Sequence, residues 1–314
     1  MSVDRQNDII AEYTSALDSF VEQLQRDSNI LAAIVYGSLV RGDVWSESDI
    51  DMLIITKDES LPYQQHWLKD GDILIQIDVH SRKNFRDWMD VPLQGSVLHH
   101  IIYTGKLLFS NDDTITEYYE NPSRIGDRDK SLGMMIYADN ALGYLSKVRK
   151  SIVHQKDAML AFRWLNGLIL QVAHLEVLSH GDVPSREVTL QARKYNPDLF
   201  GKSYFSMLEE GVTLEACETG YNLCQSYLEK YADILFEPIA AYILEQGGHC
   251  GISQIDKHFR KKLNRNDTFT LISSCEFLAR LGLLQKMVYP LKLTSRSRFE
   301  VYEAGYLCME SEML

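Results

Sequence analysis

Apolar and polar residues follow different periods in different parts of the chain, and these periods mark the expected helices and strands. From about Asp4 to Arg26 apolar residues recur every three or four positions, which predicts an amphipathic helix. Ile30–Tyr36 is an unbroken apolar run of the kind expected for a buried strand. Asp49–Thr56 alternates acidic with apolar residues, and Ile73–His80 is a further strand pattern. We therefore expect a sheet with the first helix packed on it.

Weaker patterns fill the rest of this first region. Leu61–Lys69 is expected to be a connection or a short helix, and Gly71-Asp72 marks a turn. The later segments predict two helices and a last strand, at Arg82–Met89, Val97–Tyr103 and Lys106–Ser110. We place the end of this region at residue 111 and expect residues 112–128 to form a linker.

The remainder of the chain is mostly helical in pattern. From Ser131 to about Gly247 the spacing of apolar residues predicts a series of helices. The pattern then changes to two helices, at Ile252–Leu263 and Thr268–Leu281, and a strand-like end at Arg298–Tyr302. Two helices followed by a two-stranded ribbon resemble a winged helix.

The most informative chemistry lies between the first two strands. Asp49 and Asp51 are two residues apart on one strand, so both point to the same face. Two adjacent carboxylates repel each other, and a hard divalent cation, most often Mg²⁺, is the usual compensation. Gly37-Ser38 ends the preceding strand and begins a helix, where the Ser38 hydroxyl and free backbone N–H groups can hold a phosphate. This combination is suited to phosphoryl or nucleotidyl transfer.

The arrangement resembles the nucleotidyltransferase superfamily that includes DNA polymerase beta. The residues that carry the resemblance are Gly37-Ser38 after an apolar run, the spacer Leu39–Ser48, and Asp49-Ile50-Asp51 flanked by apolar residues. The resemblance covers roughly Leu31 to Val79 and is weak beyond. It implies an α+β protein, with a polymerase beta-like mixed-sheet domain at residues 1–111. An all-α domain that closes the cleft would follow at 112–247, and a winged-helix-like domain at 248–314.

The same resemblance implies roles for six residues. Gly37 and Ser38 would hold the β and γ phosphates of a nucleoside triphosphate, ATP or another, and Arg41 would touch the triphosphate. The three acids would form the catalytic and metal-binding set, with two Mg²⁺ ions: Asp49, Asp51 and Asp78. Asp78 lies on the strand after the acid pair, and it would complete the second metal site or take the acceptor proton as general base.

Charge restricts the class of substrate. The 314-residue chain has a net charge of −12, which argues against a polymerase that holds long nucleic acid through a basic surface. Between Gly251 and Glu300, however, ten basic and four acidic side chains leave this segment at +6 and the remainder at −18. The second helix of the winged-helix-like segment carries only Arg280 as a base, so we expect this segment to pack or dimerise. The helix before it is basic, so nucleic acid or an acidic protein remains a possible binding partner of this segment.

Composition also indicates the compartment. The five cysteines form no CxxC pair, which favours reduced cytoplasmic thiols over a disulfide framework or a zinc site. The most apolar long stretch, Leu165–Leu178, contains polar residues and is too short to span a bilayer. We therefore expect a soluble cytoplasmic protein with no membrane partner.

These observations lead to one main hypothesis and two alternatives. The main hypothesis is a Mg²⁺-dependent nucleotidyltransferase that moves AMP from ATP onto a hydroxyl of a small acceptor such as an aminoglycoside. An acidic cleft would attract such a cationic compound. One alternative is nucleotidyl transfer to a partner protein. The other is a non-catalytic regulator that senses nucleotide. The three mutually repelling carboxylates weigh against this alternative, because a site that has lost its catalytic activity has no reason to keep them.

Overall fold

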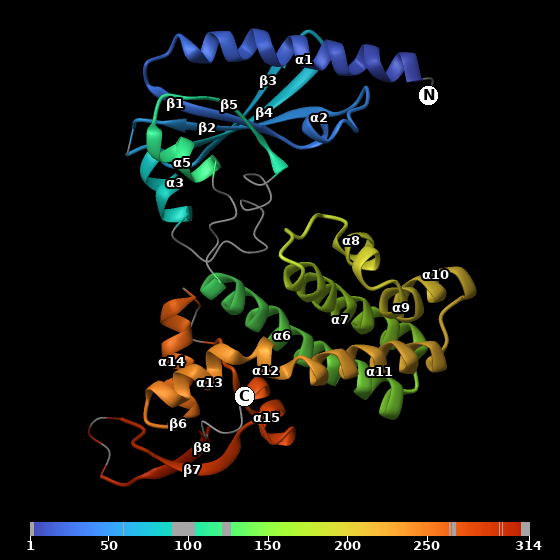
Figure 1. The fold of residues 1–314 in the computed structure, drawn as a ribbon, viewed down its shortest axis with the longest axis vertical. Coiled ribbons are helices and arrows are strands. Elements are labelled where there is room, and N and C mark those ends of the chain that lie inside the picture. Colours follow the sequence, from blue (N-terminus) through green and yellow to red (C-terminus); the bar gives the residue numbers. More distant parts are fainter. Residues whose placement is uncertain are drawn as a thin grey trace. The chain divides into compact units, whose positions relative to one another are not determined.

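Figure 1 shows the fold in a computed structural model that describes residues 3–58, 60–89, 104–120, 127–263, 265, 268–294, 296 and 298–308. The chain divides into two compact units, Met1–Gly126 and Asp127–Leu314. The two units are described separately. The predicted helix at Val97–Tyr103 lies outside the described residues.

The first unit is built on a five-stranded mixed sheet. Its strands run in the spatial order β3-β4-β2-β1-β5, and β2 and β4 are parallel whereas the other neighbours are antiparallel. The bounds of the strands are β1 Ile30–Tyr36, β2 Asp49–Thr56, β3 Gln64–Asp70, β4 Ile73–Ser81 and β5 Lys106–Ser110. Four of these strands occupy segments predicted from the apolar pattern.

Helices cover both faces of this sheet. The long helix α1 (Val3–Gln25) packs on one face, because its apolar stripe meets residues such as Ile50 and Met52. On the other face, α3 (Arg82–Met89) and α5 (Asp113–Glu120) contribute Phe85 and Ile115 to a smaller core around Leu53. The alternation of strand side chains thus divides the apolar residues between two cores.

Two predictions for this unit were wrong. Leu61–Lys69 was expected to be a connection or a short helix, but most of it forms the edge strand β3. All residues of β3 after Gln64 are exposed, so the segment has no apolar period to reveal it. The expected linker 112–128 contains the helix α5, which packs on the sheet through the buried Ile115.

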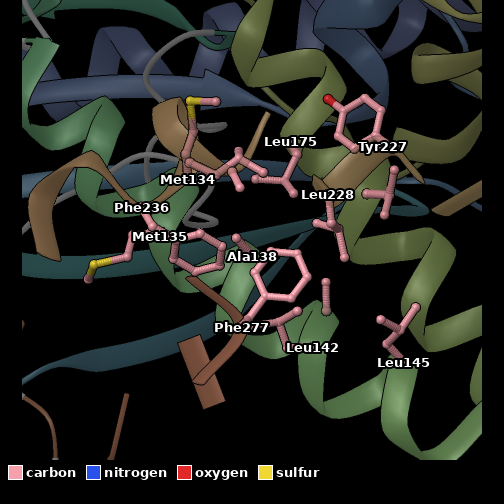
Figure 2. Packing of buried hydrophobic residues seen from close by; sticks show 14 of the residues in the cluster. Met134, Met135, Ala138, Leu142, Leu145, Leu175, Tyr227, Leu228, Phe236 and Phe277 are labelled. Carbon is pink, nitrogen blue, oxygen red and sulfur yellow. The ribbon is translucent and has the colours of Figure 1, made fainter. Parts of the chain in front are cut away.

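The second unit begins with helices packed around one apolar core. Figure 2 shows α6 (Asp127–Lys150) at its centre, with Met135, Ala138 and Leu142 facing residues of later elements. The helices that follow are α7 Ala158–Ser179, α8 Val188–Tyr195, α9 Pro197–Phe200, α10 Ser206–Glu210, α11 Leu214–Lys230, α12 Ala232–Leu235 and α13 Glu237–Glu245, with π-helical turns at Ser151–Gln155 and Gly201–Phe205.

Among the described residues, one helix is long and apolar enough for a membrane span by length and composition. This helix is α7, in which Leu165, Leu168 and Val172 are fully buried in the core of the second unit, whereas Met159 and Leu170 are exposed.

The chain ends in the order of elements found in a winged helix. After α13 come β6 (His249–Gly251), α14 (Ile252–Lys262) and α15 (Ile272–Arg280), and then the hairpin of β7 (Gln285–Leu291) and β8 (Val301–Leu307). The three strands form a sheet in the order β6-β8-β7. The winged-helix-like order and the α+β class agree with the sequence prediction, although β6 has only three residues and was missed.

The helices and the winged-helix-like segment share a core. The buried cluster of the second unit runs from Leu132 to Cys308, and the rings of Phe236 and Phe277 lie 5.9 Å apart, centroid to centroid. The Ser274 hydroxyl on α15 also donates to the Asp139 carboxylate on α6, at 2.6 Å. The compact units divide at Gly126 rather than at residue 111, and the separation into three domains stays a prediction.

Candidate functional site

The acid pair lies on the sheet face opposite α1. On β2, Ile50 and Met52 are fully buried under α1, while Asp49 and Asp51 are half-buried on the other face. The register of β2 and β4 places Asp49 opposite Leu74 and Asp51 opposite Gln76. The predicted alternation of acidic and apolar side chains is therefore the alternation of the strand itself.

A glycine brings the turn after β1 close to Asp51. Gly37 has φ 82° and ψ −151°, a backbone conformation that is essentially restricted to glycine. A Cβ atom at this position would lie 2.1 Å from the Asp51 carboxylate oxygen Oδ2, so only glycine leaves room for this carboxylate. Ser38 then begins the short helix α2 (Ser38–Arg41). The turn and the acid pair are thus neighbours, as the spacing in the sequence predicts.

The loop after α2 is held by α1. The Tyr13 hydroxyl donates to the Ser48 carbonyl at 2.8 Å, and the Gln6 amide donates to the Val44 carbonyl at 2.5 Å. Arg41 is exposed and pairs with Asp43, with 3.3 Å between Arg41 Nε and Asp43 Oδ2. The predicted role of Arg41 at a triphosphate would require it to exchange this partner for phosphate oxygens.

Asp78 is held in place by three neutral donors. Its Oδ2 atom accepts from the Tyr36 hydroxyl at 2.8 Å, and its Oδ1 atom accepts from the Tyr63 hydroxyl at 2.8 Å and the Gln65 amide at 3.1 Å. On β4, Asp78 is opposite Leu53 of β2, and Leu53 is two residues farther along β2 than Asp51. Asp78 therefore shares the face of the acid pair.

The electrostatics of this face are those of closely spaced acids. Burial is the largest cause that raises the pKa of the Tyr36 hydroxyl, and its bond to Asp78 and the charges of Asp78 and Asp51 act in the same direction. The bond to Asp78 also raises the pKa of Tyr63. Both hydroxyls therefore stay protonated and donate to Asp78.

The residues fit a Mg²⁺ site built on two carboxylates. In sites that transfer phosphate groups, Mg²⁺ is held by one or two carboxylates together with substrate phosphates and water. Asp49 and Asp51 supply that set on one strand face beside a turn that only glycine can form. Among the described residues, no ion pair involves Asp49.

The three predicted acids do not gather around one point. Within the ranges that the structure describes, no group of three or more His, Cys, Asp or Glu side chains could hold a metal ion. The reason lies in the register, because Asp78 is displaced from Asp51 by two residues, about 7 Å, and its oxygens are occupied by donors. A metal-ligand role for Asp78 stays a prediction.

The residues that hold Asp78 could not be predicted from the sequence. Tyr36 ends a buried strand, where an aromatic residue has an ordinary packing role, and Tyr63 and Gln65 lie in a segment that was not predicted to be a strand. Only the pairing of β3 with β4 shows that Gln65 is opposite Asp78.

In the winged-helix-like segment, one face of the second helix, α15, is buried in the core. Of the residues of α15, Ser274, Cys275, Phe277 and Leu278 are buried. Its Glu276 accepts from the Tyr306 hydroxyl at 2.8 Å and is bonded to Lys286. This helix packs against α6, and the expectation that the segment serves only packing or dimerisation stays a prediction.

Comparison with known proteins gives a family for the first unit and a fold for the chain. Residues 19–114 match the family model described as polymerase beta, nucleotidyltransferase. No curated protein sequence matches the chain. Among solved structures, the chain is similar to a nucleotidyltransferase-like protein from Exiguobacterium sibiricum 255-15, with a TM-score of 0.63 and 15% identity. The similarity covers 95% of this chain and 99% of the other, and at this identity it shows a shared fold.

Proposed function

We propose that this protein is a Mg²⁺-dependent nucleotidyltransferase, because residues 19–114 match the nucleotidyltransferase family model. It transfers a nucleoside monophosphate, AMP from ATP by the resemblance, to a hydroxyl of a small acceptor such as an aminoglycoside-like compound. The observation that carries the proposal is the position of Asp49 and Asp51 on one strand face, with Asp51 against the Gly37 backbone.

Each residue of the turn and the acid pair has a role in this proposal. Gly37 and Ser38 hold the β and γ phosphates at the start of α2, and Arg41 adds a positive charge to the triphosphate. Asp49 and Asp51 would hold the Mg²⁺ ions, as their oxygen donors and shared face allow. When bound, these ions neutralise charge that develops on the α-phosphate and the departing pyrophosphate.

Asp78 serves as the general base in the proposal. Its hydrogen bonds from Tyr36, Tyr63 and Gln65 fix the orientation of the carboxylate. A carboxylate has about four lone-pair sites, so three donors leave about one site for the proton of the acceptor hydroxyl. That oxygen then attacks the α-phosphorus, the bond between the α-phosphorus and the bridging oxygen breaks, and pyrophosphate leaves.

Two features bear on the cellular location of the protein and on the choice between an enzyme and a regulator. The five cysteines are buried and free, which supports a reducing, cytoplasmic location. The second helix of the winged-helix-like segment, α15, carries Arg280 as its only basic residue, which weighs against a regulator that reads DNA through this helix. We therefore favour catalysis over nucleotide sensing.

The experiment that tests the proposal follows label from the α-phosphate. The purified chain is incubated with Mg²⁺ and α-labelled ATP, GTP, CTP or UTP, together with aminoglycosides, lincosamides or a lysate. The proposal predicts label on a small molecule, from one preferred nucleotide. Label on a protein band would support the protein acceptor instead, and nucleotide binding without any transfer would contradict the enzymatic proposal.

A further inference from the structure

Two aromatic side chains are exposed at the edge strand β3. Trp67 is 54% exposed and Tyr63, just before the strand, is 53% exposed. Leu74 on the neighbouring strand is 44% exposed. Proteins normally blunt an edge strand with charges, proline or a covering element, because an exposed apolar edge promotes aggregation. β3 carries such charges at Lys69 and Asp70, and Trp67 and Tyr63 are exposed beside them.

Strand register places this aromatic surface on the face of the acids. Trp67 is opposite Gln76, and Gln76 is opposite Asp51, so one row of side chains leads from the acid pair to the indole. With neighbouring strands about 4.8 Å apart, the Cα atoms of Trp67 and Asp51 are separated by about 10 Å. That distance is close to the width of one sugar ring with its substituents.

A second row leads to the same edge. Leu74 is opposite Asp49 on one side and Lys69 on the other, and Lys69 pairs with Asp72. The half-buried Gln76 offers an amide between the carboxylates and the indole. The surface thus combines an aromatic plane, an aliphatic side chain and a polar amide, the kinds of group that line small-molecule sites. An aromatic plane and an amide suit the apolar face and the hydroxyl groups of a hydroxylated ring.

Topology also fixes the side from which an acceptor would approach. The turn at Gly37-Ser38 follows β1, which borders β2 on one side, whereas β4 and β3 lie on the other side. In an in-line displacement the attacking and leaving oxygens are on opposite sides of the phosphorus. With the β and γ phosphates at the turn, the acceptor approaches over β4 and β3.

We propose that Trp67, Tyr63 and Leu74 form the acceptor subsite, and that the acceptor is a hydroxylated ring, such as a sugar or cyclitol, that stacks on the indole of Trp67. The inference rests on the proposed function and specifies its substrate class. Because Tyr63 also donates to Asp78, the same subsite joins ring recognition to the position of the general base.

The test compares two neighbouring positions of β3. Trp67→Ala removes the stacking plane, and Leu68→Ala is the matched control, since Leu68 is 39% exposed but is opposite Ile75 and so lies on the other face. For the acceptor found by label transfer, we expect Trp67→Ala to raise the acceptor KM about tenfold, and Trp67→Phe to restore most of it. The KM for the nucleotide should change less than about twofold in all three variants.

The outcomes separate this inference from the proposed function. If the protein transfers label and the acceptor KM of Trp67→Ala equals that of Leu68→Ala, the proposed subsite is wrong and the proposed function still holds. If the protein transfers label to nothing, the function fails, and the subsite is tested alone by fluorine NMR of 5-fluorotryptophan protein, with Trp67→Phe to assign the signal. A shift of the Trp67 signal with kanamycin, lincomycin or myo-inositol would support the subsite, and no shift with any of them would overturn it.

Discussion

Replacement of Gly37 by alanine tests how closely the phosphate turn and the acid pair are joined. The new Cβ would lie 2.1 Å from Asp51 Oδ2, where ordinary contact begins near 3.4 Å, so the carboxylate or the turn must move by more than 1 Å. Moving a catalytic group by about 1 Å can reduce the rate about 100-fold. We therefore expect Gly37→Ala to lower label transfer by about two orders of magnitude.

Stability should change through two separable effects. Alanine at a left-handed φ costs about 1–2 kcal/mol, and overpacking against the carboxylate adds about 1–3 kcal/mol. Gly42→Ala, at the other end of α2, is the control for a positive φ without a clash, because no atom lies within 4 Å of the added Cβ. Gly42 has φ 77° and ψ 14°, where alanine is less strained than at Gly37. Urea unfolding should show a loss of about 1–2 kcal/mol for Gly42→Ala and a larger loss for Gly37→Ala.

A double-mutant cycle isolates the clash. In an Asp51→Ala background the carboxylate is gone, so Gly37→Ala should retain only the backbone-strain part of its effect on the unfolding free energy, without the clash. The coupling between the two positions should be about 1–3 kcal/mol. Equal effects of Gly37→Ala with and without the carboxylate, together with transfer at the parent rate, would refute the reasoning.

Three other changes probe different parts of the structure. Tyr36→Phe removes a donor to Asp78 and should lower the unfolding free energy by about 1 kcal/mol. It should also lower kcat while the nucleotide KM changes little. An unchanged kcat would show that the function of Asp78 does not depend on Tyr36. Burial raises the pKa of the Cys224 thiol from 9.0 to about 12, so between these values only the unfolded chain releases the proton and stability should fall as pH rises. Cys224→Ala should make the urea-unfolding free energy fall less steeply in that pH window, and an unchanged slope would contradict the assignment. A chain ending at Gly247 should lose the cooperative unfolding of the second unit, because it exposes Phe236 and Ile243 of the shared core; a folded, cooperative fragment by calorimetry would show that the last segment is an independent domain.

The catalytic face was largely predictable because its signal is local. The turn at Gly37-Ser38, the acids Asp49 and Asp51 and the buried strands around them all lie within one short stretch, where strand alternation fixes which side chains share a face. Asp78 could be added from the next apolar strand for the same reason. The structure placed these residues on one face, although it did not gather the three acids as one metal-binding group.

The parts of the fold and of the site that could not be predicted from the sequence depend on contacts between distant segments. β3 has an exposed, polar sequence, and only its pairing with β4 makes it a strand and brings Gln65 to Asp78. The packing of α15 on α6 joins Ser274 to Asp139, residues far apart in the chain, and no local period encodes it. Likewise α5 was expected to be a linker because the buried Ile115 and the partly buried Tyr119 carry too little apolar pattern to predict a helix.

The most direct test of the central claim compares labels on the two ends of ATP. The wild-type chain, Asp49→Asn and Asp51→Asn are each incubated with Mg²⁺, the acceptor and either α-labelled or γ-labelled ATP. Our account predicts that the wild type moves the α label to the acceptor and releases the γ label in pyrophosphate, and that both variants remain folded and lose transfer by a factor of about 1,000 or more. Transfer of the γ label to the acceptor, or full activity in either variant, would contradict it.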